Sequence, residues 1–408
     1  MLSEQQTATI KATAPALEAC GETLARDMYA RMFKNNPEVK PYFNPAHQQS
    51  GRQQRALASA VCAYAQYVDN PAALADAVEL IANKHVSLGI LPEHYPIVGK
   101  NLLESIEAVM GDAATPEVLD AWAAAYAQLA DIFIAREHTL YDAQQQRYGW
   151  TGLKPFVVAR REPASDNILS LYLEPEDGAP LAAQRPGQYV AVHSTLPDGT
   201  TALRNYSLSN APGTPYYRIS VKREHAPSDT APAGVFSHYA HDQLAVGDRV
   251  RLSPPCGEFT LAPVPQDGRA LVLLAGGVGI TPLLSMLHAA LAAAPDRRVV
   301  LVQAVRNEGL RPFAAELATL VEAHPNFELH VRYSEDAPET VPAAAQASPG
   351  FIDDALMDAV VGDRPAEYYF CGPNPMLAHV CRMLDARDVG REHMHYEFFG
   401  PADSLAAA

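Results

Sequence analysis

The stretch Ala270-Leu-Val-Leu-Leu-Ala-Gly-Gly-Val-Gly-Ile-Thr-Pro282 joins an apolar run to a glycine-rich turn. A buried strand that leads through glycines into a helix is typical of a βα unit in a parallel sheet. We expect Thr281 to cap this helix and Pro282 to take its first position, so that the helix-end amides can hold a pyrophosphate. The glycines do not complete the Rossmann pattern, because the third glycine is missing.

Other apolar runs follow this stretch and alternate with helical stretches as far as the end of the chain. The alternation predicts a doubly wound α/β domain with a parallel sheet over residues 265–408. The apolar runs are Ala270–Leu274, Val299–Val302, Phe327–Val331 and Tyr368–Phe370.

Upstream of this domain, residues 150–262 contain short β-rich runs separated by Pro, Gly and Asp turns. About five or six such strands in roughly a hundred residues predict a small antiparallel β-barrel. The clearest runs are Phe156–Val158, Ile168–Leu173, Gln188–Val192 and Tyr217–Val221.

Residues 1–147 have a helical pattern, because apolar side chains recur at helical spacing from Leu74 to Leu88 and again from Leu119 to Phe133. The segment also contains few of the chain's prolines and glycines. We therefore expect an all-α domain here, and a multidomain protein of three parts.

Composition excludes several classes of protein. The net charge of −16, from 31 Lys+Arg against 47 Asp+Glu, disfavours a nucleic-acid binder. No apolar stretch reaches the roughly 20 residues of a membrane span, and the N-terminus has no signal-peptide pattern, so we expect no integral membrane segment and a cytoplasmic location. The five scattered cysteines form neither a disulfide framework nor a zinc motif. We further expect a monomer.

The helical segment places polar side chains on its inward face. His85 shares the apolar stripe of its helix, and Glu137 lies one turn after Phe133 on the last one. A hydrogen-bonded core histidine is the simpler interpretation of His85 alone. Taken together, a buried His, Gln, two Tyr and Glu predict a haem pocket, in which a carboxylate orients an iron-binding imidazole. The set is Tyr29, Gln53, Tyr64, His85 and Glu137.

The segment resembles the globin domain of bacterial and yeast flavohaemoglobins, and the resemblance extends over the whole chain. It is carried here by Tyr29, Phe43-Asn44, Gln53, Leu57, Lys84-His85, Tyr95, Trp122 and Ile134-Ala-Arg-Glu137. The resemblance implies that His85 binds the iron of haem b, with Tyr95 and Glu137 behind it, and that Phe43 packs on the haem. Tyr29, Gln53 and Leu57 would line the distal side, where the tyrosine hydroxyl holds dioxygen. The resemblance also implies that Lys84 is a catalytic residue. It leaves open whether the distal pocket binds a lipid.

The second segment resembles flavin domains of the ferredoxin-reductase type. The resemblance implies that Arg204 neutralises the FAD pyrophosphate, that Tyr206 stacks on the isoalloxazine and that Ser207 bonds near flavin N5. A helix Ser237–Leu244 would bind phosphate through the Ser237 hydroxyl and through the backbone amides of its first turn. In isolation, Arg204 could be a solvated turn charge and Tyr189 a barrel residue, and Ala233 stands where the family usually has a glycine. The implied FAD-binding residues are Tyr189, Arg204, Asn205, Tyr206, Ser207, Gly234, Val235, Phe236 and Ser237.

The third segment resembles the nicotinamide domain of the same reductases, through its glycine loop, the Cys371-Gly-Pro373 turn and the final Tyr396-Glu-Phe-Phe-Gly-Pro401. Glu397 matches a carboxylate near flavin and haem, although it could be a solvated end-strand charge. Arg306 could receive the 2′-phosphate of NADPH and Glu308 the 2′-hydroxyl of NADH; the resemblance favours NADH. The implied binding residues are Gly277, Val278, Gly279, Ile280, Thr281, Pro282, Cys371, Gly372, Pro373, Phe398, Phe399, Gly400 and Pro401.

The resemblance implies an electron-transfer chain from NADH or NADPH through FAD to haem iron. At the iron, O2 and NO would be converted to nitrate. This is nitric oxide dioxygenase activity. Two alternatives remain: a general flavin or haem reductase with a vestigial globin, and an oxygen- or lipid-binding haem protein. The complete flavin and nicotinamide motifs count against the second alternative, because a binding module needs no reductase.

Overall fold

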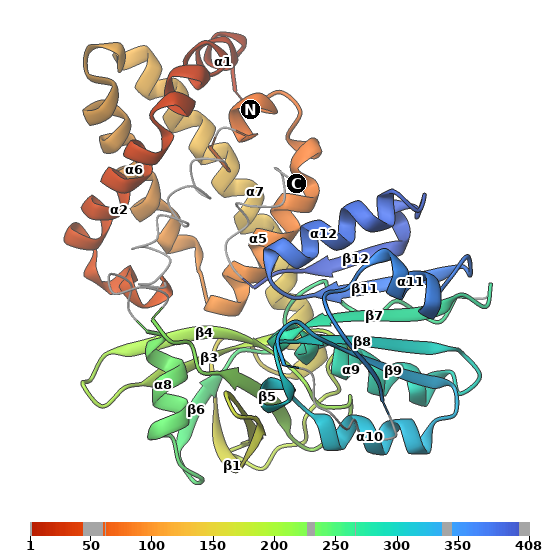
Figure 1. The fold of residues 1–408 in the computed structure, drawn as a ribbon. Helices are drawn as coiled ribbons and strands as arrows, with labels where there is room; N and C mark the ends of the chain where they lie inside the picture. The colour runs from red at the N-terminus through yellow and green to blue at the C-terminus, as the bar shows by residue number, and fades with distance from the viewer. Residues whose placement is uncertain are drawn as a thin grey trace.

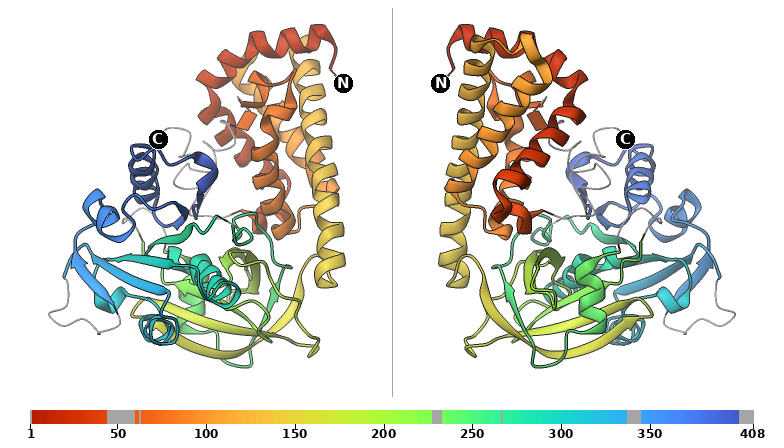
Figure 2. Two further views of the ribbon diagram at one scale, coloured as in Figure 1. Left: turned by 90° about the vertical axis from the view of Figure 1, so that its right-hand side faces the viewer. Right: turned by 90° about the vertical axis from the view of Figure 1, so that its left-hand side faces the viewer.

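A computed structural model describes residues 2–43, 60–61, 63–226, 233–265, 267–336 and 345–399. It has a helical part, an antiparallel sheet and a parallel sheet, in that order along the chain (Figure 1). Figure 2 shows that the helical part stands over the two sheets, while the C-terminal elements lie beside it. The predicted multidomain fold class is confirmed.

The helical part begins with a capping box, in which Ser3 and Gln6 exchange hydrogen bonds. Its core is formed by large buried side chains that include Met28, Met32 and Ile106. The predicted helix from Leu74 is observed within one residue. The main helices are α1 (Glu4–Ala19), α2 (Gly21–Asn35), α5 (Ala75–Leu88), α6 (Tyr95–Met110) and α7 (Pro116–Tyr148), with 3₁₀ turns η1 (Pro37–Tyr42), η2 (Pro71–Leu74), η3 (Pro92–His94) and η4 (Gly111–Ala113).

Helix α7 is the longest element of the helical part. By length and composition alone it could cross a membrane, a test that the core helices of many proteins also pass. Its inward face, with Trp122, Phe133 and Glu137, is buried against the other helices. It ends at Gly149, whose φ of +81° is typical of a glycine after a helix. The expected absence of an integral membrane segment stays a prediction.

The antiparallel sheet has the strand order β4-β3-β6-β1-β2-β5. An isolated antiparallel bridge between Leu208 and Ile219 connects its two edges, as expected for a small barrel. Apolar residues that alternate along the strands, such as Val190 and Val192, fill its interior. The strands are β1 (Lys154–Ser165), β2 (Ile168–Pro175), β3 (Tyr189–Thr195), β4 (Thr201–Ser207), β5 (Tyr217–Lys222) and β6 (Arg249–Leu252).

The parallel sheet has the order β10-β9-β8-β7-β11-β12, and every neighbouring pair in it is parallel. The chain order reverses between β7 and β11, and ligands of open α/β sheets bind at such a switch point. The strands are β7 (Ala270–Gly276), β8 (Val299–Val305), β9 (Phe327–Tyr333), β10 (Gln346–Pro349), β11 (Ala366–Cys371) and β12 (Met394–Glu397).

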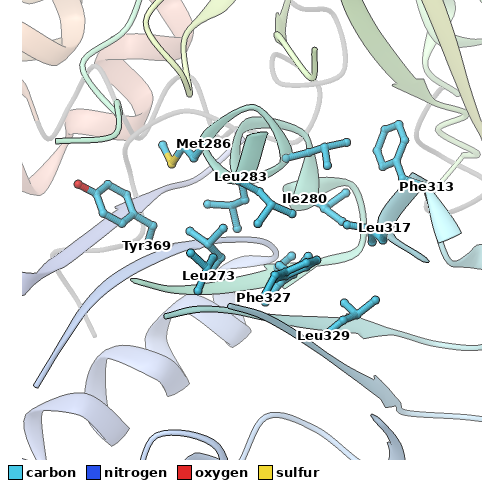
Figure 3. Close-up of a cluster of buried hydrophobic side chains, with 14 of the residues drawn as sticks. Leu273, Ile280, Leu283, Met286, Phe313, Leu317, Phe327, Leu329 and Tyr369 are labelled. Atoms are coloured by element: carbon cyan, nitrogen blue, oxygen red, sulfur yellow. The ribbon is translucent and has the colours of Figure 1, made fainter. Parts of the chain in front are cut away.

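Helices cover both faces of this sheet. On one face, α9 packs Ile280, Leu283 and Met286 against Leu273 and its neighbours (Figure 3). The helices of this part are α9 (Ile280–Ala293), α10 (Ala314–Ala323), α11 (Asp354–Val360) and α12 (Asn374–Asp385), with 3₁₀ turns η5 (Gly277–Gly279), η6 (Glu308–Leu310) and η7 (Arg391–His393).

Two predicted helix starts are wrong. Helix α9 begins at Ile280 rather than after Thr281, because the 3₁₀ turn η5 continues directly into it and the Thr281 hydroxyl bonds back to Val278 O. Helix α8 (Val235–Asp242) begins two residues before Ser237. The last extended residue there is Gly234, and Ser237 occupies the third helical position. The domain limits themselves stay predictions.

Candidate functional site

The His85 side chain meets two partners from other helices. Its Nδ1 lies 2.7 Å from Glu137 Oε1 on α7 and 3.1 Å from the Tyr95 hydroxyl at the start of α6. Tyr95 donates to the same Glu137 oxygen at 2.5 Å. Because a carboxylate accepts the proton on Nδ1, Nε2 is the nitrogen left to bind a ligand. The structure therefore assembles the three residues that the sequence predicted to act together.

Glu137 is buried, with 2% of its surface exposed, and among the described residues its Oε2 has no hydrogen-bond partner. A buried carboxylate is costly unless it is paired. In this arrangement its pairing depends on His85 and Tyr95. A hydrogen-bonded core histidine, the simpler interpretation of His85, would also make this contact; the haem interpretation adds a use for the free Nε2.

Three aromatic rings of the helical part form a second cluster. Tyr29 lies 5.8 Å from Phe33 and 5.5 Å from Phe43 between ring centroids. Burial raises the pKa of Tyr29 well above its ordinary value, so its hydroxyl stays protonated and able to donate. Among the described residues, the structure gives this hydroxyl no hydrogen-bond partner. The predicted distal residues Gln53 and Leu57 lie outside the described residues.

Strands β3 and β4 bring the predicted flavin residues together. Tyr189 lies opposite Ser207 in the register, and strand alternation puts Arg204 and Tyr206 on the other face of β4. Arg204 therefore lies in a strand rather than a turn. Burial lowers its pKa, as is expected for a guanidinium that is removed from water. The Tyr206 ring contacts Phe236 of α8 at 5.5 Å.

The loop before α8 requires a glycine at position 234. A Cβ on Gly234 would lie 2.6 Å from Ser237 Oγ and 2.9 Å from Glu224 Cβ. The Ser237 hydroxyl itself donates to Gly234 O at 2.8 Å and accepts from Glu224 N at 3.1 Å. The hydroxyl thus joins two loop segments, and its role as a phosphate contact stays a prediction. Val235 is exposed beside this turn.

The carboxyl ends of β7 and β11 lie side by side at the switch point, where we expect the nucleotide crevice. A Cβ on Gly279 would collide with the carbonyl of Cys371 and would lie 2.8 Å from Gly372 N. A Cβ on Gly276 would lie 2.8 Å from Pro373 Cδ. The glycine loop and the Cys371-Gly-Pro turn thus pack backbone to backbone, and the close approach explains both sets of glycines.

Strand β12 ends beside this crevice, with Glu397 next to Cys371 in the register. Burial raises the pKa of Glu397 to about 7, while the positive charge of Lys84 opposes the shift. The Lys84 ammonium also lies 5.3 Å from the centre of the Phe398 ring. The C-terminal segment therefore contacts the helix that carries His85. Gly400 and Pro401 lie outside the described residues.

Glu308 and Arg306, which could distinguish NADH from NADPH, have different surroundings. Glu308 is bonded by Arg311 at 3.2 Å and by the Tyr333 hydroxyl. Arg306 is exposed, with Glu335 at 3.9 Å. Neither arrangement by itself selects between the two nicotinamide cofactors.

No sequence pattern predicts the contact between strand β5 of the barrel and the helices of the third part. Arg218 of β5 donates to Glu316 of α10 at 2.7 Å, and His288 of α9 bonds the same carboxylate at 2.7 Å. Burial opposes ionisation of Glu316, but the bonds from His288 and Arg218 outweigh it and lower its pKa to about 2. Residues 98 positions apart are joined here, so no local pattern could have revealed the pair.

Three family models match the chain in the order of its parts. They are a globin over residues 26–133, an oxidoreductase FAD-binding domain over 156–261 and an oxidoreductase NAD-binding domain over 273–382. A solved flavohemoglobin from Malassezia yamatoensis, with bound FAD and heme, covers 98% of this chain and 100% of its own with a TM-score of 0.83 and 26% identity.

A solved FAD/NAD-binding domain of nitric oxide dioxygenase from Vibrio cholerae O1 biovar El Tor covers 61% of this chain and 99% of its own, with a TM-score of 0.54 and 32% identity. Curated flavohemoproteins match at full length. The protein from Rhodopirellula baltica is 47% identical over all of both chains, and that from Bordetella pertussis is 46% identical over 98% of this chain and 99% of its own. The chain therefore belongs to the flavohemoprotein family of oxidoreductases.

Proposed function

We propose that the protein is a nitric oxide dioxygenase that uses NADH or NADPH, FAD and haem b to convert NO and O2 to nitrate. The observation that carries the proposal is the His85–Tyr95–Glu137 arrangement in a chain that also contains both nucleotide-binding parts. The name of the Vibrio cholerae relative supports the reaction, and the relative from Malassezia yamatoensis supports the cofactors.

The helical part fits a haem. Imidazole Nε2 is the usual ligand of haem iron, and a carboxylate on Nδ1 fixes the ring and raises its basicity. The buried Glu137 carboxylate contributes negative charge behind His85, which suits an imidazole bound to a positive iron centre. We assign His85 as the iron ligand, with Phe43 and the Tyr29 hydroxyl on the side where dioxygen would enter.

The two sheet parts fit FAD and a nicotinamide cofactor. Arg204 is a half-buried cation of the kind that neutralises a pyrophosphate, and Tyr189 and Tyr206 supply aromatic rings beside it on β3 and β4. The close backbone contact of Gly279 with Cys371 brings the glycine loop and the Cys371-Gly-Pro turn together at the switch point, where a dinucleotide would lie. We assign these residues, with Asn205 and Ser207, to cofactor binding.

When bound, haem would supply the iron at which O2 and NO react, and FAD would relay the electrons of NAD(P)H to it singly. The chain's own residues would orient the iron ligand and polarise the bound dioxygen. Glu137 and Tyr95 hold the Nδ1 proton of His85 and give the imidazole greater electron-donating character. The Tyr29 hydroxyl would donate a hydrogen bond to bound dioxygen, and Lys84 with Glu397 lies where the C-terminal segment meets α5.

The overall reaction balances as two NO, two O2 and one NAD(P)H giving two nitrate ions, NAD(P)⁺ and one proton. The test is to measure NO consumption and nitrate formation by the purified holoprotein with NADH, and to record its visible spectrum. We expect a Soret band together with flavin absorption, and NO consumption that requires O2. Absence of NADH-driven NO consumption would contradict the proposal.

The variant His85→Ala separates this proposal from its alternatives. We expect it to lose haem and NO consumption while FAD binding and NADH–dye reductase activity persist. His138→Ala is the matched control, because His138 is exposed on α7. A general reductase with a vestigial globin would retain NO consumption in His85→Ala. An oxygen- or lipid-binding protein would not reduce its haem with NADH even as wild type. The cytoplasmic location and the monomeric state stay predictions.

A further inference from the structure

Helix α5 contacts the other helices with one face and the antiparallel barrel with another. His85 is directed to Glu137 and Tyr95 on α7 and α6. Asn83 and Ser87, at helical spacing from each other, are buried on a face that meets the antiparallel barrel. Between them Val86 packs with Tyr189 and Cys256 of the barrel. The helix that carries the proposed iron ligand is therefore also the helix that contacts the proposed flavin residues.

Asn83 makes the first polar contact across this boundary. The Gly257 amide donates to Asn83 Oδ1 at 3.2 Å, and both groups are buried. The Asn83 amide is held in turn, because its Nδ2 donates to Glu79 O at 3.0 Å and to Glu79 Oε1 at 2.8 Å. Arg136 donates two hydrogen bonds, of 2.6 and 2.8 Å, to the Glu79 carboxylate. The Asn83 rotamer is thus fixed from α7, by the residue next to Glu137.

Gly257 has little freedom on the barrel side. Its φ is +102°, and a Cβ there would lie 2.8 Å from the Tyr189 ring. Its carbonyl accepts hydrogen bonds from Arg185 at 3.2 Å and Gln188 at 3.5 Å. Any shift of the Gly257 amide relative to α5 therefore moves the loop that packs on Tyr189.

Ser87 makes the second contact, one helical turn after Asn83. Its side chain is fully buried, and Asn205 Nδ2 donates to Ser87 Oγ at 3.3 Å. The Ser87 hydroxyl donates to Lys84 O at 2.8 Å within the helix. Asn205 lies between Arg204 and Tyr206, so this contact reaches a second flavin segment.

We propose that Asn83 and Ser87 are positioning residues, which hold α5 against the barrel and thereby set the rate of electron transfer from flavin to haem. The inference rests on the proposed function, since it requires both cofactors. Two hydrogen bonds, one to the Gly257 loop and one to strand β4, fix both the distance and the rotation of α5. A purely structural role would affect stability but would not affect one electron-transfer step selectively.

The test compares Asn83→Ala and Ser87→Ala with wild-type holoprotein in stopped-flow reduction by NADH under anaerobic conditions. Flavin reduction and the later haem reduction are followed at separate wavelengths. Loss of positioning far from the chemistry can cost on the order of a hundredfold, and we expect haem reduction to slow about ten- to a hundredfold in Asn83→Ala. We expect a smaller, several-fold slowing in Ser87→Ala. Flavin reduction and the haem spectrum should be unchanged in both.

The matched control is Asn101→Ala. Asn101 is equally buried, but among the described residues its side chain bonds only within the helical part, to Ile97 O at 2.8 Å and to asparagines of the α2 end. We expect normal electron transfer in this variant. Hydrogen exchange gives a second readout: the Gly257 amide should exchange faster in Asn83→Ala and at the wild-type rate in Asn101→Ala.

Haem reduction at the wild-type rate in both Asn83→Ala and Ser87→Ala would overturn the inference. Equal slowing of haem reduction in Asn101→Ala would also overturn it. If Asn83→Ala fails to fold, Ser87→Ala still decides, because alanine fills nearly the same space as serine. If wild-type protein itself does not reduce haem with NADH, the proposed function fails, and that result differs from an active wild type with unaffected variants.

Discussion

His85 Nδ1 lies 2.7 Å from Glu137 Oε1, although the two residues are 52 positions apart in the chain. This single contact decides which imidazole nitrogen is available to iron. It also explains why a carboxylate is tolerated in the core of a helical domain, since the carboxylate accepts from both His85 and Tyr95.

The first prediction concerns Glu137→Gln. The amide keeps the size of the side chain but removes the charge that draws on the Nδ1 proton, so the imidazole becomes a weaker electron donor. We expect the iron–histidine stretching frequency to fall in resonance Raman spectra, and NO turnover to drop about 10- to 100-fold, as is common for such partners of ligands. Glu104→Gln, at a partly exposed position of α6 where, among the described residues, it forms an ion pair only with Lys100, is the control. An unchanged stretching frequency would contradict the assignment.

The second prediction concerns Tyr29→Phe. Loss of a hydrogen bond to a charged acceptor costs about 1.5–3 kcal/mol, so O2 should dissociate roughly ten- to a hundredfold faster. NO binding should change little, because bound NO is less polar, and reduction of haem by NADH should be unaffected. Flash photolysis under O2 measures the effect, with Tyr67→Phe at an exposed site as control. If Tyr29 only packs against Phe33 and Phe43, the dissociation rate will equal that of wild type.

The third prediction concerns Arg204→Ala and Ser207→Ala. Removal of a hydrogen bond to a charged group should weaken FAD binding by about 1.5–3 kcal/mol. Haem reduction by NADH should fail as FAD is lost, while dithionite still reduces the iron. Flavin content after gel filtration measures the change, and Arg160→Ala, on an exposed part of β1, should retain full flavin. Normal occupancy and turnover in both variants would reject the assignment.

The fourth prediction concerns Gly279→Ala. The added methyl group would collide with the Cys371 carbonyl, so the glycine loop and the Cys371-Gly-Pro turn must separate. We expect hydride transfer from NADH to FAD to fall by at least about tenfold, because misplacement of reacting groups is costly. FAD content should be unchanged, since the barrel is not touched. Stopped-flow flavin reduction is the measurement, and a normal rate would show that this close approach is not required.

The fifth prediction concerns the pH dependence of Glu397. Burial raises its pKa from 4.5 to about 7, and the Lys84 charge opposes this rise. The native protein therefore binds this proton more tightly than the unfolded chain, so Glu397 contributes less to stability as pH rises from 4.5 through about 7. Lys84→Gln should raise the pKa further. The carbonyl band of the protonated acid, assigned with Glu397→Gln, would follow the titration by infrared spectroscopy; an unshifted midpoint in Lys84→Gln would refute the coupling.

Helix and strand positions were largely predictable from the sequence, because burial of one face imposes a period on the chain. The stripe from Leu74 to Leu88 predicts α5 within one residue, and the apolar runs predict β7, β8, β9 and β11, although not the short strands β10 and β12. The starts of α8 and α9 were not predictable in this way. They depend on which backbone groups the hydroxyls of Ser237 and Thr281 bond in the folded turns.

The sequence by itself determined the three-part order of the chain and the residue types of each candidate site, since periodicity, turn residues and motif spacing are local properties. Only the tertiary structure decided which of these residues meet. Glu137 pairs with His85 across 52 positions, and Gly257 bonds Asn83 across 174. Hydrogen bonds and burial depend on distance in space, and a chain pattern records no distances between elements that the fold brings together.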